Sequence, residues 1–436
     1  MNRLSVSAAK KQGQGSVTVA GFVHNKRVHK GVVFVDLRDL SGLLQLVVLE
    51  SEVTAYQAVE GLNLESVLEA SGILQEKPAK KGAEPGEKDF ELLVKEIKVL
   101  SSAAEQLPIQ VLQKIDNEAD LDNRLNWRFL DLRKEEHRLI FSVWTELEKG
   151  FRKYFSDQNF FQIYTPTLMS TASETGADVF AVKYFERQAY LSQSPQFYKQ
   201  MAMAAGMEKV FMVGPVYRAE KSFTNRHVTE FTGLDFEISY IASHEDVMKT
   251  EEEMLVAGFQ ALAEKNLPLE FAVPTLPFPR LTLAEVKAKL AAKGIKSEAD
   301  DDLNPEEERA ICALVKEEMN HDFIFVTDYP VSARPFYHMR HEDNPQLTKS
   351  FDLLYQGIEI TTGAQREHRV EVLEAQALEK GMNLEELADY LNFFRFGCPP
   401  HGGVGIGPAR IIMKLLGLGN IKEAIFLPRD VKRLNP

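Results

Sequence analysis

The sequence predicts a multidomain α+β protein, in which a small N-terminal β-barrel precedes a larger domain of mixed helices and strands. Residues 1–105 contain five short strand-like runs separated by turn residues. Residues 131–436 instead mix amphipathic helical patterns with further strand-like runs. The length of 436 residues leaves room for two or three domains of about 100–200 residues each. We expect residues 106–130 to form a hinge between the two domains.

The barrel prediction depends on the spacing of its strands. Gly21, Gly31 and the Ser41–Gly42 pair interrupt runs that are rich in Val, Leu and Phe. Five short strands within ~100 residues are typical of a small closed barrel such as an OB-fold. The expected strands span residues 16–25, 31–36, 43–49, 66–74 and 90–100.

The larger domain begins with the clearest helical pattern. Apolar residues from Ile140 to Tyr154 recur at alternating spacings of four and three, which predicts a helix over 135–154. Ser194 and Pro195 predict another helix, with Ser194 as its N-cap and Pro195 at its first position. Further strands are expected at 210–220, 231–241, 323–327 and 350–369, and further helices at 370–380 and 408–416.

The expected strand at 231–241 carries carboxylates on one face. Alternation along a strand places Phe236 and Ile238 on one side and Asp235 and Glu237 on the other. A carboxylate on a buried strand is costly unless a partner uses its charge. The pattern therefore predicts a functional role for that face.

The charge of the chain is unevenly distributed. A net charge of −13 argues at first against nucleic acid, because phosphate backbones attract basic surfaces. However, residues 241–330 carry 19 acidic and 9 basic residues, whereas residues 1–105 carry 14 and 13. We interpret residues 241–330 as a helical insertion or subdomain whose charges are mostly solvated and lie outside the motifs described below.

Cysteine content and hydropathy exclude several classes of protein. Only Cys312 and Cys398 are present, which excludes a disulfide framework and a four-cysteine zinc site. No signal-peptide apolar region follows Met1, and no run of about 18 apolar residues could cross a membrane. We therefore expect a cytoplasmic protein with no membrane partner.

Charged residues between Arg218 and His227 suit a nucleoside triphosphate. Arg218 and Glu220 are expected on one strand face, with Arg226 and His227 folded back over that face by a short loop. Guanidinium groups pair with phosphate oxygens and stay charged. The alternative is a hairpin that carries surface ion pairs.

Two further groups of polar residues are candidates for ligand binding. Asp352 and Glu359 could hold Mg²⁺, which prefers hard oxygen ligands, although they could also be unrelated surface acids. Gln196 and Lys199 lie in the first turn of an expected helix, where Lys199 could pair with a substrate carboxylate or simply be solvated.

A glycine-rich run, residues 401–407, precedes Arg410. Glycine allows a ligand to approach the backbone, and Arg410 could stack on a base or hold a phosphate. The run matches neither the Walker A pattern nor G-x-G-x-x-G. The alternative is a packing site between a strand and a helix. Cys398 and His401 alone are too few ligands for a metal site.

Together these segments resemble the class II aminoacyl-tRNA synthetases, and most closely the aspartyl-tRNA synthetases of the archaeal type. The family's first, second and third signature motifs are similar to residues 135–166, 218–237 and 402–430. Residues 193–199 and 350–366 resemble segments specific to aspartate enzymes. The resemblance implies an anticodon-binding OB barrel and a catalytic domain built on an antiparallel sheet, in a homodimer.

The resemblance also implies a two-step reaction. ATP and aspartate form aspartyl-adenylate with release of diphosphate, and the 3′-hydroxyl of tRNA then takes the aspartyl group. Arg218 and Arg410 would be the catalytic residues, and Mg²⁺ would be held by Asp352, Glu359 and Thr362. The residues implied to bind ATP are Arg218, Glu220, Arg226, His227, Val228, Glu359, Gly407, Pro408, Ala409 and Arg410. The residues implied to bind aspartate are Glu174, Gln196, Lys199, Arg218, Asp235, Thr362 and Arg366.

In the barrel, Phe34 and Gln45 match the family's anticodon readers, with Glu91 as a weaker candidate. Without the resemblance, Phe34 would be read as a core residue. His24 stands where enzymes that charge both aspartate and asparagine tRNAs tend to carry His, and where enzymes restricted to the aspartate tRNA tend to carry Trp. The resemblance therefore favours a non-discriminating enzyme whose partners are both tRNAs.

One departure and two alternatives remain. Ala409 stands where the third motif usually has Glu, although Arg410 is retained. An asparaginyl-tRNA synthetase shares the fold and motifs, but an amide substrate gives Lys199 no carboxylate to pair with. A non-catalytic OB-fold RNA-binding paralogue is the other alternative, and the retained arginines argue against it.

Overall fold

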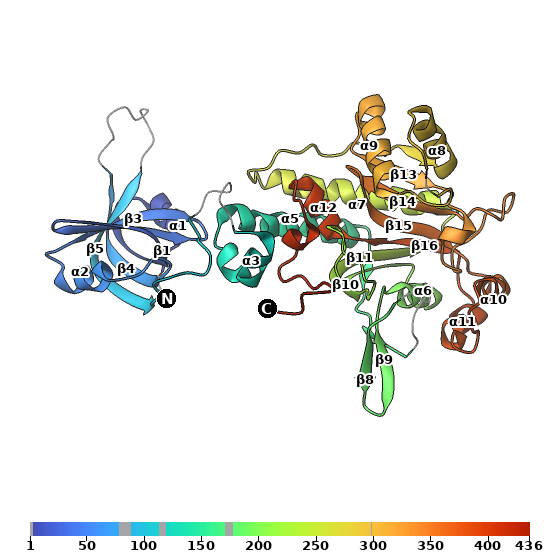
Figure 1. Cartoon of the computed structure of the whole chain (residues 1–436), viewed down its shortest axis with the longest axis horizontal. Coiled ribbons are helices and arrows are strands. Elements are labelled where there is room, and N and C mark those ends of the chain that lie inside the picture. The colour runs from blue at the N-terminus through green and yellow to red at the C-terminus, as the bar shows by residue number, and fades with distance from the viewer. Residues whose placement is uncertain (1–2, 78–88, 113–118, 171–177, 298) are drawn as a thin grey trace. The chain divides into compact units, whose positions relative to one another are not determined.

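The computed structural model describes residues 3–77, 89–112, 119–170, 178–297 and 299–436 (Figure 1). The chain divides into two compact units, Met1–Leu130 and Asp131–Pro436. The hinge expected at 106–130 falls within the first unit in this division. None of the helices in the described part of the chain has the length and apolar character needed to cross a bilayer.

The first unit contains the predicted five-stranded barrel. The strands close in the order β1-β2-β3-β5-β4, and every neighbouring pair is antiparallel except β3 and β5. Alternate residues point inward, so that Val33, Val35 and Leu37 of β2 are fully buried. The OB-fold prediction is therefore confirmed. The strands are β1 Gly15–His29, β2 Val32–Asp39, β3 Gly42–Leu49, β4 Val67–Glu76 and β5 Phe90–Ser101.

Two short helices of the barrel unit were not predicted. Helix α1 (Val6–Gln12) begins after Ser5, whose side chain accepts a hydrogen bond from the Ala8 amide, and α2 (Val53–Glu60) follows β3. Each buries two apolar residues in the barrel core. Helices α3 (Leu121–Asn126) and α4 (Arg128–Asp131) follow the barrel, where a hinge was expected.

The second unit is built on an eight-stranded sheet in the order β12-β13-β14-β15-β16-β11-β10-β6. The six strands from β13 to β10 are antiparallel, as predicted, while the edge strands β12 and β6 pair in parallel. The sheet is therefore mixed at its edges. Its strands are β6 Phe161–Gln162, β10 Lys209–Tyr217, β11 Glu230–Ser239, β12 Arg280–Thr282, β13 Phe323–Thr327, β14 Ser350–Tyr355, β15 Ile358–Arg366 and β16 His401–Ile406.

Helices cover both faces of this sheet. On one face, α5 (Glu135–Asp157), α7 (His244–Glu264) and α12 (Pro408–Leu415) share an apolar core with Phe236 and Ile238 of β11. On the opposite face, α6 (Gln196–Ala204) packs against β11 with Lys199 close to Asp235 and Glu237. The predicted alternation along β11 is thus realised. Helix α6 begins one residue later than expected, because Pro195 takes the N-cap position.

The acidic stretch 241–330 is not a detached insertion. Helix α7 belongs to the main core, and β12 and β13 are strands of the central sheet. Helices α8 (Leu283–Ala292) and α9 (Pro305–Met319) form a smaller core with Ile324, Val326 and Leu354 of the sheet. Its charges were expected to lie mostly on solvated faces, but four of its glutamates are buried. They are Glu251, Glu252, Glu307 and Glu308.

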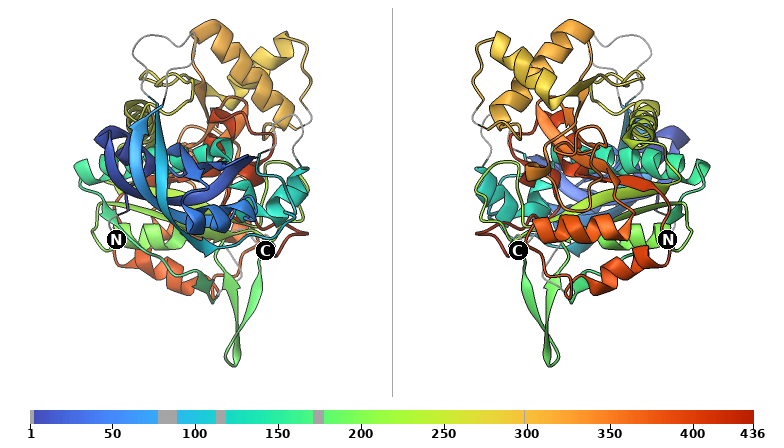
Figure 2. Two further views of the ribbon diagram at one scale, coloured as in Figure 1. Left: turned by 90° about the vertical axis from the view of Figure 1, so that its left-hand side faces the viewer. Right: turned by 90° about the vertical axis from the view of Figure 1, so that its right-hand side faces the viewer.

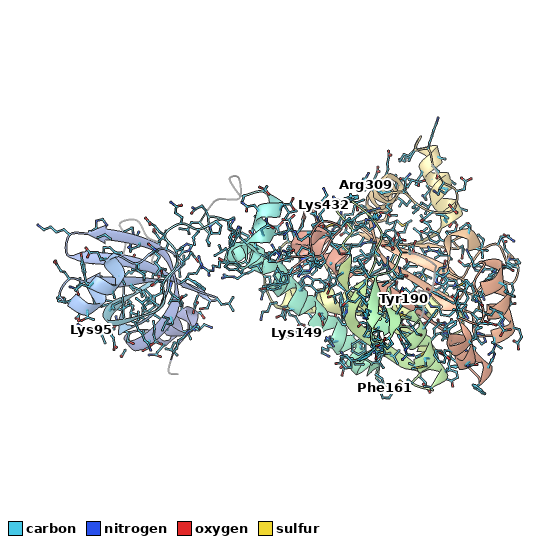
Figure 3. All side chains as sticks on the ribbon, turned by 60° about the horizontal axis from the view of Figure 1, so that its bottom comes forward. Lys95, Lys149, Phe161, Tyr190, Arg309 and Lys432 are labelled. Atoms are coloured by element: carbon cyan, nitrogen blue, oxygen red, sulfur yellow. The ribbon has the colours of Figure 1, made fainter. Side chains whose placement is uncertain are left out.

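Smaller elements complete the second unit. Strands β7 (Leu168–Met169), β8 (Ala181–Tyr184) and β9 (Arg187–Leu191) form a separate sheet, and the β8–β9 hairpin projects from the unit (Figure 2). Helices α10 (Val370–Glu379) and α11 (Ala388–Arg395) enclose a further apolar cluster. Phe161 of edge strand β6 lies at the surface with 59% of its area exposed (Figure 3).

Candidate active site

A cavity of about 370 Å³ lies over strands β10, β11, β15 and β16. It brings together thirteen of the residues that the sequence assigned to ATP, aspartate or metal. Lys199, Asp352 and Pro408 do not line it, and Glu174 lies outside the described residues. The thirteen are Gln196, Arg218, Glu220, Arg226, His227, Val228, Asp235, Glu359, Thr362, Arg366, Gly407, Ala409 and Arg410.

The glycines of β16 make room for the carboxylates of β11. Gly403 pairs with Glu237 in the sheet, and a Cβ at Gly403 would lie 2.2 Å from Glu237 Oε2. Gly405 pairs with Asp235, and a Cβ there would lie 3.2 Å from Asp235 Oδ2. The glycine-rich run is therefore a strand on which two acidic side chains lie, and a side chain at Gly403 would displace Glu237.

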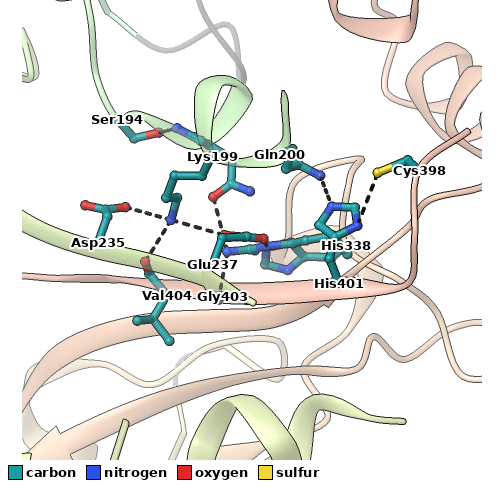
Figure 4. A network of polar contacts seen from close by, with 12 residues as sticks. Ser194, Lys199, Gln200, Asp235, Glu237, His338, Cys398, His401, Gly403 and Val404 are labelled. Carbon is teal, nitrogen blue, oxygen red and sulfur yellow. Dashed lines mark hydrogen bonds and ion pairs between the residues drawn. The ribbon is translucent and has the colours of Figure 1, made fainter. Parts of the chain in front are cut away.

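The buried end of the cavity is a compact network of opposite charges (Figure 4). Lys199 Nζ lies 2.8 Å from Asp235 Oδ2, 3.3 Å from Glu237 Oε2 and 2.8 Å from the Val404 carbonyl oxygen. The Lys199 side chain is only 1% exposed. A buried lysine at this position is tolerated because these three oxygens satisfy its ammonium group.

All three guanidinium nitrogens of Arg366 donate hydrogen bonds. Its Nε donates to Glu237 Oε1 at 3.1 Å, and its Nη1 donates to His338 Nε2 at 2.7 Å. Its Nη2 donates to Gln196 Oε1 at 3.2 Å and to the Gly403 carbonyl oxygen at 2.8 Å. This arrangement fixes the orientation of Arg366 at the wall of the cavity.

The pKa values follow from this burial and pairing. Burial raises the pKa of Asp235, although the charge of Lys199 opposes the shift. Burial also opposes ionisation of Glu237, but the charges of Arg366 and Lys199 lower the pKa of Glu237 below its ordinary value. Burial and the neighbouring Arg366 lower the pKa of His338 well below its ordinary value. His338 is therefore neutral and accepts through Nε2.

The opposite end of the cavity is rich in arginine. Arg218 follows the last residue of β10, its amide donates to the Thr229 carbonyl at 2.9 Å, and its guanidinium carbon lies 5.5 Å from the Phe231 ring centroid. Arg218 and Glu220 thus lie beyond the strand, so their prediction as one strand face is wrong, although both line the cavity. The pairing of β10 with β11 ends at Tyr217, which lies opposite Glu230.

His227 and Arg410 complete this end. Burial, followed by the charges of Arg410, Arg226 and Arg218, lowers the pKa of His227 to about 4. A neutral His227 leaves the three arginines as the cations of this wall. Arg410 lies in the first turn of α12, as predicted, and its Nη1 donates to the Glu359 carbonyl oxygen at 2.7 Å.

The two candidate metal carboxylates occupy different environments. Glu359 lines the cavity and accepts from Thr362 Oγ1 at 3.2 Å, whereas Asp352 is buried beside it. Arg334 Nη2 donates to Asp352 Oδ2 at 2.7 Å, while Asp352 Oδ1 has no hydrogen-bond partner among the described residues. No cluster of three or more His, Cys, Asp or Glu suited to a metal is found in the described part of the chain.

Sequence reasoning missed Arg334 and His338. Both line the cavity, and both lie between β13 and β14, where the chain has almost no regular secondary structure. Arg334 stacks on Tyr329, with its guanidinium carbon 3.7 Å from the ring centroid. No hydrophobic periodicity marks this segment, so the sequence offered no signal beyond the residue types themselves.

The barrel carries its candidates on an outer face. Phe34 lies between the buried Val33 and Val35 on β2 and is only partly buried, so the reading of Phe34 as a core residue is wrong. Arg27 lies over the Phe34 ring at 5.9 Å. Gln45 on neighbouring β3 donates to Glu91 Oε2 at 2.9 Å.

His24 of the barrel contacts Arg38, which forms a buried ion pair with Glu65. Arg38 Nη1 lies 2.7 Å from His24 Nδ1, and Arg38 Nη2 donates to Glu65 Oε2 at 2.7 Å. Burial and the charge of Arg38 lower the pKa of His24. Its ring is therefore held in a fixed place on β1.

Two family models match the chain. The tRNA synthetases of class II (D, K and N) match residues 120–431, and the OB-fold nucleic acid binding domain matches residues 17–100. An aspartate–tRNA(Asp/Asn) ligase of Aeropyrum pernix is 41% identical and covers 97% of this chain and 96% of its own. An aspartate–tRNA(Asp) ligase of Pyrococcus abyssi is 38% identical, with 96% of both chains covered.

Solved structures agree with these relatives. A putative aspartyl-tRNA synthetase from Leishmania major Friedlin has a TM-score of 0.88 at 28% identity and covers 100% of this chain and 95% of its own. An asparaginyl-tRNA synthetase from Pyrococcus horikoshii, complexed with asparaginyl-adenylate, has a TM-score of 0.86 at 31% identity, with 98% and 97% covered. The chain therefore belongs to the class II tRNA synthetases, among the aspartyl-tRNA synthetases of the archaeal type.

Proposed function

We propose that this chain ligates L-aspartate to tRNA through an aspartyl-adenylate formed from ATP. The observation that carries the proposal is a single cavity with two chemically distinct ends. One end presents Arg218, Arg226 and Arg410, which suit the phosphates of a nucleotide. The other presents Arg366, held by buried Glu237, which suits a small carboxylate.

The first step needs positioning rather than a general base. An α-carboxylate is already a nucleophile, so its oxygen attacks the α-phosphorus while the bond to the bridging oxygen breaks and diphosphate leaves. Arg218 stabilises the charge that develops on the α-phosphate. In the second step the 3′-hydroxyl oxygen of tRNA attacks the acyl carbon, the bond from that carbon to the phosphate oxygen breaks, and AMP leaves with a phosphate that can take up the hydroxyl proton.

Aspartate is selected by the charge network. Arg366 pairs with the side-chain carboxylate, with Gln196 beside it, and Asp235 receives the α-ammonium group. Lys199 already has three acceptors, so direct contact with substrate requires it to release the longest of them, Glu237 at 3.3 Å. The amide of asparagine carries no negative charge to pair with Arg366 and presents N–H donors to a guanidinium that can only donate, and a site built on such pairing discriminates strongly.

Magnesium fits the oxygens at the nucleotide end. Glu359 and the Thr362 hydroxyl lie together, and the buried Asp352 Oδ1 lacks a hydrogen-bond partner in the described structure. These are hard oxygen donors of the kind that Mg²⁺ uses alongside water and phosphate. When bound there, the ion would supply positive charge to the phosphates of ATP.

We propose that the partners are aspartate and asparagine tRNAs and a second copy of the chain. His24 supports the broader tRNA set, as do relatives that are named for both tRNAs. A homodimer is supported by Phe161 in the edge strand β6 and by Tyr164 just after it, which are 59% and 82% exposed. Light scattering after size exclusion would measure the mass of the protein in solution, which a homodimer predicts to be twice that of one chain.

One experiment tests amino acid and tRNA together. Purified protein with ATP and Mg²⁺ should attach aspartate to both the aspartate and the asparagine tRNA, and should attach asparagine to neither. Attachment of asparagine would favour an asparaginyl-tRNA synthetase, which the similar asparaginyl enzymes of known structure make the second candidate. Charging of the aspartate tRNA alone would contradict the broader tRNA set, and no charging at all would favour the non-catalytic alternative.

Phe34→Ala should weaken tRNA charging and spare the aspartate-dependent exchange of pyrophosphate into ATP. Phe34 is only partly buried on the outer face of β2, where a base can stack on its ring. Stacking on an aromatic ring contributes about 1–3 kcal/mol per base, so the KM for tRNA should rise by about 5- to 150-fold. Equal losses in charging and exchange would show that the barrel does not act separately in tRNA binding.

A further inference from the structure

Arg226, in the loop between β10 and β11, has a partner from a distant part of the chain. Its Nη1 donates to Glu308 Oε2 at 2.6 Å, and Glu308 lies on α9 within the acidic stretch. The Arg226 side chain is 19% exposed and lines the cavity, whereas that of Glu308 is 7% exposed. The acidic stretch therefore reaches the candidate nucleotide end of the cavity.

Helix α9 holds Glu308 firmly in place. The helix begins with a capping box in which the Asn304 side chain accepts from the Glu307 amide, while Glu307 accepts from the Asn304 amide. Ile311 and Val315, on the next turns, pack against sheet residues in a buried apolar core. Arg226, by contrast, lies in a loop without helix or strand. Glu308 is thus the fixed member of the pair.

The geometry leaves Arg226 able to bind a ligand while it is paired. A guanidinium has five N–H donors, and the contact with Glu308 uses Nη1. A charge-assisted bond from one nitrogen restricts the rotamers of a long side chain, so less conformational freedom is lost when a ligand binds. Glu308 also lies near Arg410, which offsets part of its negative charge.

We propose that Glu308 is a positioning residue, which holds Arg226 so that its remaining N–H groups face the outer phosphates of ATP. This role rests on the proposed nucleotide site but not on the identity of the amino acid. It assigns to helix α9 a share in ATP binding. Glu308 itself does not touch the nucleotide.

Calorimetry on the full chain tests the role with ATP and AMP as probes. Glu308→Ala should weaken ATP binding by about tenfold, because Arg226 loses its orienting bond. AMP binding should stay unchanged, because AMP lacks the outer phosphates. Glu308→Gln, whose amide oxygen can still accept from Arg226, should recover most of the ATP affinity.

Glu307→Gln is a matched control in the same helix. Glu307 pairs with Lys287 Nζ at 2.8 Å and is buried, but it does not line the cavity. Its substitution should loosen the start of α9 without changing the affinity for ATP. An equal loss of ATP affinity in Glu307→Gln would show that the stability of α9, and not the Arg226 contact, is responsible.

A double-mutant cycle gives the decisive outcome. In an Arg226→Ala background, Glu308→Ala should have no further effect on ATP binding, because the two substitutions remove the same Arg226–Glu308 interaction. Additive losses, or an ATP affinity that is unchanged or increased in Glu308→Ala alone, would overturn the positioning role. If the wild type failed to bind an aspartyl-adenylate analogue while the cycle held, the aspartate assignment would be at fault instead.

Discussion

Arg218→Ala should lower the aspartate-dependent exchange of pyrophosphate into ATP by about 10²–10³-fold. Arg218 lines the cavity directly after β10, and its backbone amide is fixed to the Thr229 carbonyl. A preorganised cation facing a phosphate contributes most when charge develops in the transition state, so the loss should fall mainly on kcat. Steady-state exchange measured at several ATP concentrations separates kcat from KM.

Lys221→Ala provides the control for this variant. Lys221 is exposed in the same loop and does not line the cavity, so its removal should leave exchange unchanged. Near-normal exchange in Arg218→Ala would contradict the assignment of Arg218 to the α-phosphate. A fall in both variants would indicate that the loop, rather than one guanidinium, is required.

Lys199→Met should destabilise the second unit by about 3–5 kcal/mol, because it leaves buried carboxylates short of a cation. Asp235 would lose its only ion pair among the described residues, and Glu237 would keep Arg366 alone. Urea unfolding monitored by tryptophan fluorescence measures the change. The variant should also discriminate less between aspartate and asparagine in pyrophosphate exchange.

The pH dependence of this variant gives a second check. Burial already raises the pKa of Asp235, and removing Lys199 takes away a charge that holds down the pKa values of both Asp235 and Glu237, so both should rise in the folded state. A group whose folded pKa lies above its unfolded value stabilises the fold at low pH and loses that contribution as pH rises. The difference in free energy of unfolding between the wild type and Lys199→Met should therefore become smaller as the pH is lowered from about 8 to about 5.

Lys153→Met is the matched control. Lys153 on α5 pairs with Asp157 at the surface, where water solvates either charge without the other. Its substitution should not measurably change unfolding. If Lys199→Met were equally mild, Asp235 and Glu237 would have to be stabilised by something other than Lys199.

The site shows what a one-dimensional pattern can and cannot predict. Alternation along residues 231–241 predicted that Asp235 and Glu237 share a face, because side-chain direction in a strand is a local property. Their partners, Lys199 and Arg366, come from α6 and β15, and no local pattern encodes that contact. Family resemblance named both cations, but not the salt bridges that join them to β11.

The misses have physical causes as well. The glycine run could not be assigned from sequence, because its purpose depends on which residues of β11 lie opposite it. Residues 241–330 were interpreted as a solvated insertion because their net charge is acidic. Net charge does not show which charges are buried, and Glu308 is a buried member of that stretch. Helix α1 did carry a local signal in its Ser5 N-cap, but seven residues are too few for a clear period.

The charge network over β16 has a consequence for how the protein matures. Its members lie on α6, β11 and β15, which are separated by tens to more than a hundred residues along the chain. Burying any one charge without its counter-charge is unfavourable, so the network should close only when the sheet is complete. Nascent or partly unfolded chains should therefore be unable to bind aspartate. Any selection of a wrong amino acid should then come from the folded protein only.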